Sequence, residues 1–537
     1  MDVAHALDEL GPYLPVGARW LPLAGWLGAA LLVGPIAAGA GLWVAGGPLR
    51  RLRRGGEVHW TERARLGHPV AVVSGACAWT VPLIMGCALA TSENALSAVP
   101  TAAISVAVIA ALYLSTKIVR RRATRGLTEF QLTFWESVRG EWLRLALLMP
   151  QLFVMVAMAL CIGTAFDPLD IAQGAIGVAA FALCCHSAGI PLLRLLGAAR
   201  PAEPALVEIV DDVAHRTGVR ASRVWVVDWP CVNALALPWS RQLAYTKSAL
   251  AKLDRDEIAA FTAHELGHLS EPTSVKLVRS IGAFALLPIG FAWPIVGRFG
   301  LVGLVAALAA TFAALLAVVR VARRMEQRAD SVAHTHDPDE GIYARALEKA
   351  YRANGAPAVM PQKRPVHPHL YDRLTAAGVA PDYPRPAPPS QRRALAGILV
   401  AALVAGAATV ALLVVPRFAQ SGESDPDRAA LWAVFVGNAD SASTLGFLHA
   451  GDEDPAQAIA WLGLAHALDP NDHDSGSFAA ELLAYRGRCD RARELLGEAE
   501  LRAAESGDED DGWIHDARDA LAQCDAQASP RGVSRGV

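Results

Sequence analysis

Residues 394–416 read ALAGILVAALVAGAATVALLVVP, a run without a single Asp, Glu, Lys or Arg. A helix of about 20 apolar residues is long enough to cross the hydrocarbon core of a bilayer. Similar uncharged runs recur along the chain, at 20–49, 69–92, 95–116, 145–166, 171–193, 280–297 and 299–319. The sequence therefore predicts a mainly α-helical, polytopic membrane protein with about eight spans.

The overall composition agrees with this prediction. Hydrophobic residues make up 53% of the chain, charged residues only 19%, and the mean hydropathy is +0.29. An ordinary soluble domain is more polar than this, so the composition points away from that class, and the number of long uncharged runs disfavours buried helices of a large soluble core. The weakest of the runs is 280–297, which is short and contains Pro288 and Pro294. For this run a re-entrant segment remains an open alternative to a full span.

The distribution of basic residues predicts the orientation, because short loops that stay in the cytoplasm are rich in Lys and Arg. RRLRR (50–54) follows the first apolar run, and KIVRRRATR (117–125) follows the third. Alternation of the spans then places residues 194–279 in the cytoplasm. The N-terminus and residues 417–537 are expected on the outer side of a bacterial inner or plasma membrane.

Charge is also divided between the two ends of the chain. Residues 418–537 contain 23 acidic and 9 basic residues, while the remainder carries a net charge of +11. An acidic segment repels the phosphates of nucleic acids, so nucleic-acid binding by this tail is excluded.

Changes in composition divide the chain into five parts. They are an N-terminal membrane domain with about five spans (1–199), a globular domain interrupted by an apolar hairpin (200–390, hairpin 280–319), the last span (394–416), a helical domain (424–525) and a disordered tail (526–537). The globular domain is expected to mix helices and strands.

Local patterns predict the elements of the globular domain. Apolar residues recur at helical spacing in 204–218, and RVWVVDW (223–229) and QLAYT (242–246) are typical of strands. A further helix is expected at 254–270, opened by Asp254 or Asp256 and ended at Pro272.

The helix at 254–270 carries the sequence HELGH. His264 and His268 are four residues apart, so they share a helix face and can bind one metal ion beside Glu265. A catalytic zinc site needs a third protein ligand. In RRMEQRADSVA (323–333), Glu326 is the expected third ligand of a single Zn²⁺, and Asp330 is expected to orient a ligand histidine. The alternative is that Glu326 and Asp330 belong to a solvated helix face.

Four blocks of sequence together carry a resemblance to a known family. NALALP (233–238), TAHELGH (262–268), EQRAD (326–330) and VHPHLYDRL (366–374) are similar to the motifs of membrane-bound gluzincin peptidases of the HtpX and CAAX-prenyl-protease family. The resemblance implies an α+β zincin-like peptidase domain that cleaves membrane or membrane-associated proteins.

The resemblance also implies roles for particular residues. Zinc would be held by His264, His268 and Glu326, and His367 and Arg373 would assist the reacting carbonyl. An edge strand that receives the substrate would consist of Asn233, Ala234, Leu235 and Ala236. One departure from the family pattern is PWSRQ (238–242), which stands where the family usually has a glycine-rich turn.

The chemistry of these residue types agrees with those roles. Glu265 is adjacent to a ligand without being one, so it can act as general base toward water and then protonate the leaving amine. A cation such as Arg373 stabilises a developing oxyanion. An edge strand can bind an extended peptide by adding it to the sheet.

The helical domain at 424–525 shows a repeat of 34 residues. Ala458, Leu462 and Ala465 recur as Ala492, Leu496 and Ala499. This period resembles tetratricopeptide helix hairpins, with a generic acidic helical bundle as the alternative. Either arrangement favours a protein or peptide partner. Cys489 and Cys524 are the two cysteines of this domain, and an oxidising compartment would let them pair.

These observations favour a membrane zinc endopeptidase with its active site at the cytoplasmic face. Two alternatives stay open. One is a sensor or receptor peptidase that is regulated by its outer domain. The other is a non-catalytic membrane scaffold with a structural zinc site, although a purely structural site has no need of Glu265.

Overall fold

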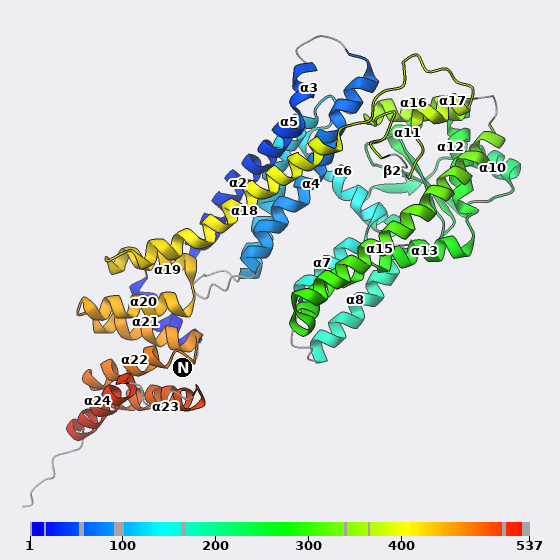
Figure 1. Cartoon of the computed structure of the whole chain (residues 1–537). Coiled ribbons are helices and arrows are strands. Elements are labelled where there is room, and N and C mark those ends of the chain that lie inside the picture. Colours follow the sequence, from blue (N-terminus) through cyan, green and yellow to red (C-terminus); the bar gives the residue numbers. More distant parts are fainter. Residues whose placement is uncertain are drawn as a thin grey trace, which may run out of the picture. The chain divides into compact units, whose positions relative to one another are not determined.

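A computed structural model describes most of the chain. The described residues are 3–14, 18–52, 58–90, 101–162, 168–187, 189–337, 341–362, 366–506 and 512–528. They are mostly helical, with several long apolar helices and one small sheet (Figure 1).

The chain divides into two compact units. The first contains Met1–Gly41, Gly75–Val119 and Gly397–Val537, and the second contains Leu42–Ser74 and Arg120–Ala396. The boundaries expected from composition, at 199, 390 and 424, stay predictions.

Seven of the described helices are long and apolar enough to cross a membrane, and a bent helix pair raises the number to at most eight. The apolar elements are α2 (Leu21–Ala45), α4 (Trp60–Ala90), α5 (Thr101–Thr124), α8 (Pro168–Ser187), α13 (Thr273–Phe284) with α14 (Leu287–Gly290), α15 (Ala292–Thr335) and α18 (Gln391–Ser421). The expected count of about eight spans stays a prediction.

The expected span at 145–166 is not one continuous helix. Its residues are divided between α6 (Phe134–Leu148) and α7 (Gln151–Cys161), which meet at an angle of 94°. Pro150 lies at the break, where its missing N–H and its ring disfavour a helical conformation of the preceding Met149. Residues 163–166 of this run lie outside the described residues.

The apolar hairpin also differs in detail from the expected runs 280–297 and 299–319. The first run is divided between α13, α14 and the beginning of α15. Gly300 interrupts α15 with a φ of 63°, a conformation that glycine adopts without strain. Thr311 Oγ1 donates a hydrogen bond of 2.6 Å to the carbonyl of Ala285, so α15 lies against the end of α13.

The sheet has the strand order β1-β2-β4-β3. Its strands are β1 (Ala199–Pro201), β2 (Arg223–Val227), β3 (Ala234–Leu237) and β4 (Gln242–Thr246). β2 and β4 are parallel, and β3 pairs antiparallel with β4 at the edge of the sheet. The strands expected at 223–229 and 242–246 are confirmed, although the first is shorter than expected.

Helices pack on this sheet around one apolar core. They are α10 (Pro204–Thr217), α11 (Lys247–Lys252), α12 (Arg255–Leu269), α16 (Ile342–Asn354) and α17 (Leu370–Ala376). Asp254 is the N-cap of α12 and forms a reciprocal capping box with Glu257, which settles the choice between Asp254 and Asp256. Almost every residue of α12 is buried, so the HELGH segment lies inside the core.

The acidic C-terminal segment is helical throughout its described part. Its helices are α19 (Pro426–Val436), α20 (Ala439–Gly451), α21 (Pro455–Leu468), α22 (His473–Tyr485), α23 (Cys489–Ser506) and α24 (Gly512–Ala528). The repeated positions on α21 and α23 are all buried. Their assignment to tetratricopeptide hairpins stays a prediction. The expected disorder of 526–537 is wrong for 526–528, which complete α24, and 529–537 lie outside the described residues.

The N-terminal helix α1 (Val3–Leu10) belongs to the same compact unit as this acidic segment. Ala6 and Leu10 are fully buried in one apolar cluster with Ala433, Trp461 and Ala465. The remaining short helices of the chain are η1 (Gly11–Tyr13), η2 (Ala18–Trp20), α3 (Gly47–Leu52) and α9 (Gly189–Leu195).

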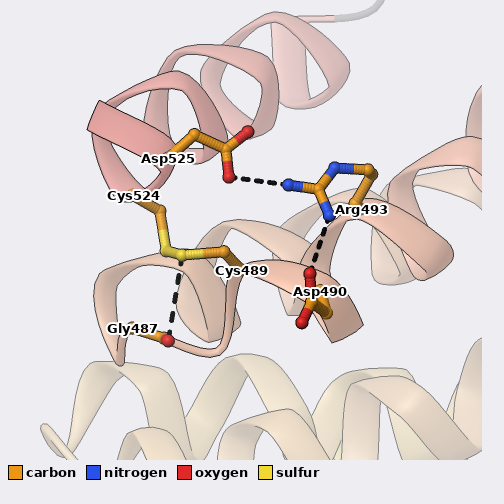
Figure 2. Close-up of a disulfide and its surroundings, with 6 residues drawn as sticks. All are labelled: Gly487, Cys489, Asp490, Arg493, Cys524 and Asp525. Atoms are coloured by element: carbon orange, nitrogen blue, oxygen red, sulfur yellow. Dashed lines mark hydrogen bonds and ion pairs between the residues drawn. A yellow bond between two sulfur atoms is a disulfide. The ribbon is translucent and has the colours of Figure 1, made fainter. Parts of the chain in front are cut away.

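A disulfide joins Cys489 at the beginning of α23 to Cys524 near the end of α24 (Figure 2). The bond closes a loop with a sequence separation of 35 residues. Arg493 connects the same two helices, because it donates hydrogen bonds to Asp490 at 2.9 Å and to Asp525 at 2.7 Å. The pairing that the sequence left open is therefore present in the structure.

Candidate active site

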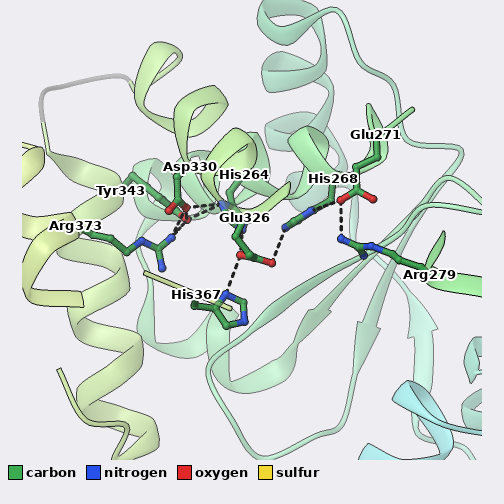
Figure 3. A network of polar contacts seen from close by, with 9 residues as sticks. All are labelled: His264, His268, Glu271, Arg279, Glu326, Asp330, Tyr343, His367 and Arg373. Carbon is green, nitrogen blue, oxygen red and sulfur yellow. Dashed lines mark hydrogen bonds and ion pairs between the residues drawn. The ribbon is translucent and has the colours of Figure 1, made fainter. Parts of the chain in front are cut away.

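Two helices bring three metal-donor side chains together. His264 and His268 come from α12 and Glu326 from α15, and one ligand atom of each lies within 4.8 Å of the other two (Figure 3). The Nε2 atom of His264 is 3.7 Å from Glu326 Oε2, and that of His268 is 3.4 Å from Glu326 Oε1. All three side chains are buried. The expected ligands are therefore neighbours in space.

Close packing of α12 against α15 makes this arrangement possible. A Cβ atom added at Gly267 would lie 2.9 Å from the Cα of Ala329 and 3.2 Å from its Cβ. Ala329 lies between Glu326 and Asp330 on α15. The glycine inside HELGH thus allows the two backbones to approach closely enough for the donors to meet.

A hydrogen-bond network fixes the ring of His264. Its Nδ1 lies 2.6 Å from the Tyr343 hydroxyl and 3.1 Å from Asp330 Oδ1, and the hydroxyl donates to the same Asp330 oxygen at 2.9 Å. Burial raises the pKa of Tyr343 well above its usual value, so the hydroxyl keeps its proton. In this network the Nδ1–H group of His264 donates, which leaves Nε2 with a lone pair for a metal.

His268 is held from the other side of the site. Its Nδ1 is 2.8 Å from Glu271 Oε1, and Arg279 donates to the same oxygen at 2.7 Å. Burial acts to lower the pKa of His268, but the carboxylates of Glu271 and Glu326 outweigh burial and raise it to about 10. The two carboxylates thus favour positive charge at this ring, which suits a site for a cation.

A cleft of about 350 Å³ opens onto the donors. Its walls include Glu265, which is 8% exposed, and the four residues from Asn233 to Ala236. Asn233 is tied to β4, because its N–H donates to Thr246 Oγ1 at 3.1 Å and its carbonyl accepts from the Thr246 N–H at 3.0 Å. In the described part of the sheet β3 pairs with β4 alone, so it is an edge strand.

His367 and Arg373 also line the cleft, but they differ in environment. The side chain of His367 is 57% exposed, and its Nδ1 lies 2.8 Å from Glu326 Oε2. Arg373 is buried and donates to Asp330 and, at 2.5 Å, to the Tyr343 hydroxyl. Arg373 thus orients the residues that hold His264. Its contact with a reacting carbonyl stays a prediction, as does that of His367.

Three residues of the site were not expected from the sequence: Glu271, Arg279 and Tyr343. Glu271 follows His268 by three residues, so its position on the same side of the helix end was a signal that could have been used. Tyr343 and Arg279 lie on other helices, α16 and α13. Nothing in their local sequence distinguishes them from residues of an amphipathic helix.

The fold and the site together define a class. Two imidazoles one helical turn apart and a carboxylate from a second helix form the donor set of a mononuclear zinc hydrolase, and a glutamate that is not a donor lies beside them. Nitrogen and carboxylate donors in this number fit one zinc ion and leave a coordination position open.

Comparison with known proteins agrees with this class. Residues 201–396 match the family described as Peptidase family M48. A protein named Protease HtpX homolog from Acidiphilium cryptum is 30% identical over 157 residues, which cover 27% of this chain and 55% of the relative. A protein of the same name from Picrophilus torridus is 32% identical over 111 residues, covering 18% of this chain and 36% of the relative. No solved structure is significantly similar to the chain.

The chain spans about half or less of the length of these relatives. The family match, the relatives' names and the three-donor cluster support a membrane-associated metallopeptidase, which is a hydrolase. The apolar helices support a membrane protein.

Proposed function

We propose that this protein is a membrane-embedded zinc endopeptidase that hydrolyses peptide bonds of membrane or membrane-associated proteins. One observation carries the proposal. His264, His268 and Glu326 place their ligand atoms within 4.8 Å of one another, although an apolar hairpin separates them in sequence. The same cleft contains Glu265 and an edge strand, which supports their proposed roles as base and substrate-binding strand.

The three donors would hold one zinc ion per chain. A bound zinc ion lowers the pKa of water toward neutrality and polarises a carbonyl oxygen. Glu265 accepts the proton of the attacking water and passes it to the leaving amine. Tyr343, Asp330 and Arg373 keep His264 oriented, and Glu271 with Arg279 does the same for His268.

The substrate would bind in extended form along β3. Main-chain hydrogen bonds to an edge strand depend little on sequence, and pockets for alternate side chains supply the selectivity. Unfolded segments of proteins fit such a site better than folded domains, because only an extended chain can add to the sheet. Residues Asn233 to Ala236 are the proposed binding edge.

The site is proposed to face the cytoplasm. The basic runs that favour the cytoplasmic side lie at 50–54 and 117–125. Residues 42–74 and 120–396 form one compact unit, so most of these basic residues belong to the same unit as the donors.

The decisive experiment replaces Glu265 by Gln in the full-length protein in detergent. We expect normal zinc content and a loss of cleavage of an unfolded protein by about 10²–10⁴-fold, because the proton acceptor is removed while the donors remain. Asp256→Asn is the matched control, since it removes an exposed carboxylate from the same helix and should leave activity unchanged. Activity that survives in Glu265→Gln would remove the proposed mechanism.

The same experiment distinguishes the proposed peptidase from a non-catalytic scaffold with a structural zinc site. A structural zinc site would give zinc in both proteins and no cleavage by either one. Cleavage by wild type that is abolished by a chelator and restored by Zn²⁺ contradicts the scaffold.

A further inference from the structure

A second large cavity lies in the same compact unit as the peptidase core, away from the metal donors. Its volume is about 1050 Å³, and its wall contains five basic side chains. They are Arg63, Arg125, Arg345, Lys349 and Arg352. We call this cavity the basic pocket. It shares no lining residue with the cleft of the active site.

The charge of the basic pocket favours an anion. Among the lining residues, two carboxylates, Glu348 and Asp382, stand against the five cations, while Lys349 and Arg352 also pair with Glu257 and Glu129 outside the lining. The five basic side chains are exposed, so a ligand can reach them from solvent. Arginine binds phosphate oxygens through two parallel hydrogen bonds, which makes phosphate the anion that suits a cluster of guanidinium groups.

The wall of the basic pocket comes from the ends of apolar helices. Leu49 and Leu52 follow the end of α2, Arg63 is in the first turn of α4, and Arg125 follows the end of α5. If α2, α4 and α5 cross the bilayer in alternating directions, the C-terminal end of α2, the N-terminal end of α4 and the C-terminal end of α5 lie on the same side of the bilayer. The basic pocket therefore lies at the level where lipid headgroups meet water.

The pocket is also amphipathic. Leu49, Leu52 and Trp60 line it on the membrane-helix side, whereas Arg345, Lys349 and Arg352 come from α16. A free phosphate ion has no apolar group that could pack against the apolar part of the wall. A phospholipid presents a phosphate together with apolar chains, and tryptophan is commonly found at the interface between them.

We propose that the basic pocket binds the phosphate headgroup of an anionic phospholipid, with the glycerol and the start of the acyl chains against the half-buried Leu52 and Val58. Basic pockets at the ends of membrane helices on the cytoplasmic side suit such headgroups. The proposal does not depend on peptidase activity.

Lys349 and Arg352 form ion pairs with residues outside the lining of the pocket. Lys349 Nζ lies 2.5 Å from Glu257, which caps α12, and Arg352 Nε lies 3.5 Å from Glu129. Replacing either would disturb those contacts. Arg63 lies on α4 and Arg345 on α16, so replacing both removes charge from two sides of the pocket.

The test is native mass spectrometry of the full-length protein after removal of its lipids. Phosphatidylglycerol and phosphatidylcholine are titrated in parallel, and inorganic phosphate and glycerol 3-phosphate are added as soluble competitors. We expect one phosphatidylglycerol to bind at least tenfold more tightly than phosphatidylcholine. The double variant Arg63→Gln and Arg345→Gln should lose about tenfold of that affinity, because each cation near the surface strengthens binding to anionic lipid.

The control variant is Arg220→Gln with Arg223→Gln, which removes the same charge from exposed positions outside the pocket. It should bind phosphatidylglycerol like the wild type. Equal affinity of the pocket variant and the control overturns the proposal. Equal affinity for both lipids also overturns it. Displacement of lipid by inorganic phosphate at equal concentration would assign the pocket to a soluble phosphate instead, and would overturn the lipid assignment. Thermal unfolding of both variants checks that each is folded.

Discussion

Each of the two histidines has its own carboxylate partner. Asp330 faces Nδ1 of His264, and Glu271 faces Nδ1 of His268. In both rings the nitrogen that faces Glu326 is the other one, Nε2. Because the carboxylates fix ring orientation and tautomer, the donors are arranged for a cation before it binds.

The hydroxyl of Tyr343 connects three residues of this network, so its removal gives a sharp test. Tyr343→Phe keeps the ring in its packing but removes the contacts to His264, Asp330 and Arg373. We expect zinc affinity to fall by about 10–100-fold, measured by competition with a chelator. Tyr371→Phe removes a hydroxyl outside the cleft and should leave the affinity unchanged. Equal zinc affinity in the two variants would mean that the hydroxyl does not support the site.

The sequence pointed to residues that lie together in the structure where the signal was local. His264, Glu265 and His268 lie within one helical turn, and the spacing of Glu326 and Asp330 marks a common helix face. Tyr343 was missed because its role arises only when α16 packs beside α12. For Arg373, sequence indicated involvement in the site, but its contacts with Asp330 and Tyr343 depend on tertiary structure.

For whole elements, the decisive contact is the one between α12 and α15. Gly267 and Ala329 bring the two helices so close that no side chain fits between them. This packing determines the distance between Glu326 and the histidines, since the three donors project from rigid helices.

Gly267→Ala should therefore impair the site without touching a ligand. The added methyl group must push against the backbone of α15, and overpacking of this kind costs about 1–3 kcal/mol. We expect reduced zinc content after purification and weaker zinc binding. Gly497→Ala is the control, because a Cβ there meets nothing within 4 Å. If Gly267→Ala bound zinc like the wild type, the close approach would not be what sets the donor geometry.

Elements were predictable to different degrees for physical reasons. Alternation and β-branched residues revealed the strands at 223–227 and 242–246, and the Asp254 cap marked the beginning of α12. Hydropathy found the apolar run at 145–166 but not the bend inside it, because an average over many residues is insensitive to one proline. Pro150 carried that information in the sequence.

At the scale of the whole molecule, both ends of the chain contribute to one apolar cluster. Leu10 of α1 is fully buried together with Trp461 of α21. A segment before the first apolar helix and a segment after the last can share a core only if they lie on the same side of the membrane. This contact agrees with a topology in which both segments lie on one side of the membrane, and the outer side stays a prediction.

The topology has a direct test in cells. Two kinds of reporter are fused after residue 425, one active only outside the cytoplasm and one active only inside it. We expect activity from the first kind alone. In the same cells Cys489 and Cys524 should resist alkylation until a reductant is added, because the oxidising side allows their bond to persist. A reporter that works only in the cytoplasm, together with free thiols at both positions, would reverse the proposed orientation.

The three donors come from two helices that are far apart in the sequence, α12 and α15, and this limits how the protein can be shortened. A fragment that stops before Thr273 keeps His264 and His268 but lacks Glu326. Glu326 follows the apolar helices α13 and α14 and the first half of α15 in the sequence. Trimming that stretch removes the support from which Glu326 projects. A soluble fragment without these helices is therefore expected to lack the complete donor set, and the full-length protein needs a detergent or lipid environment for any assay.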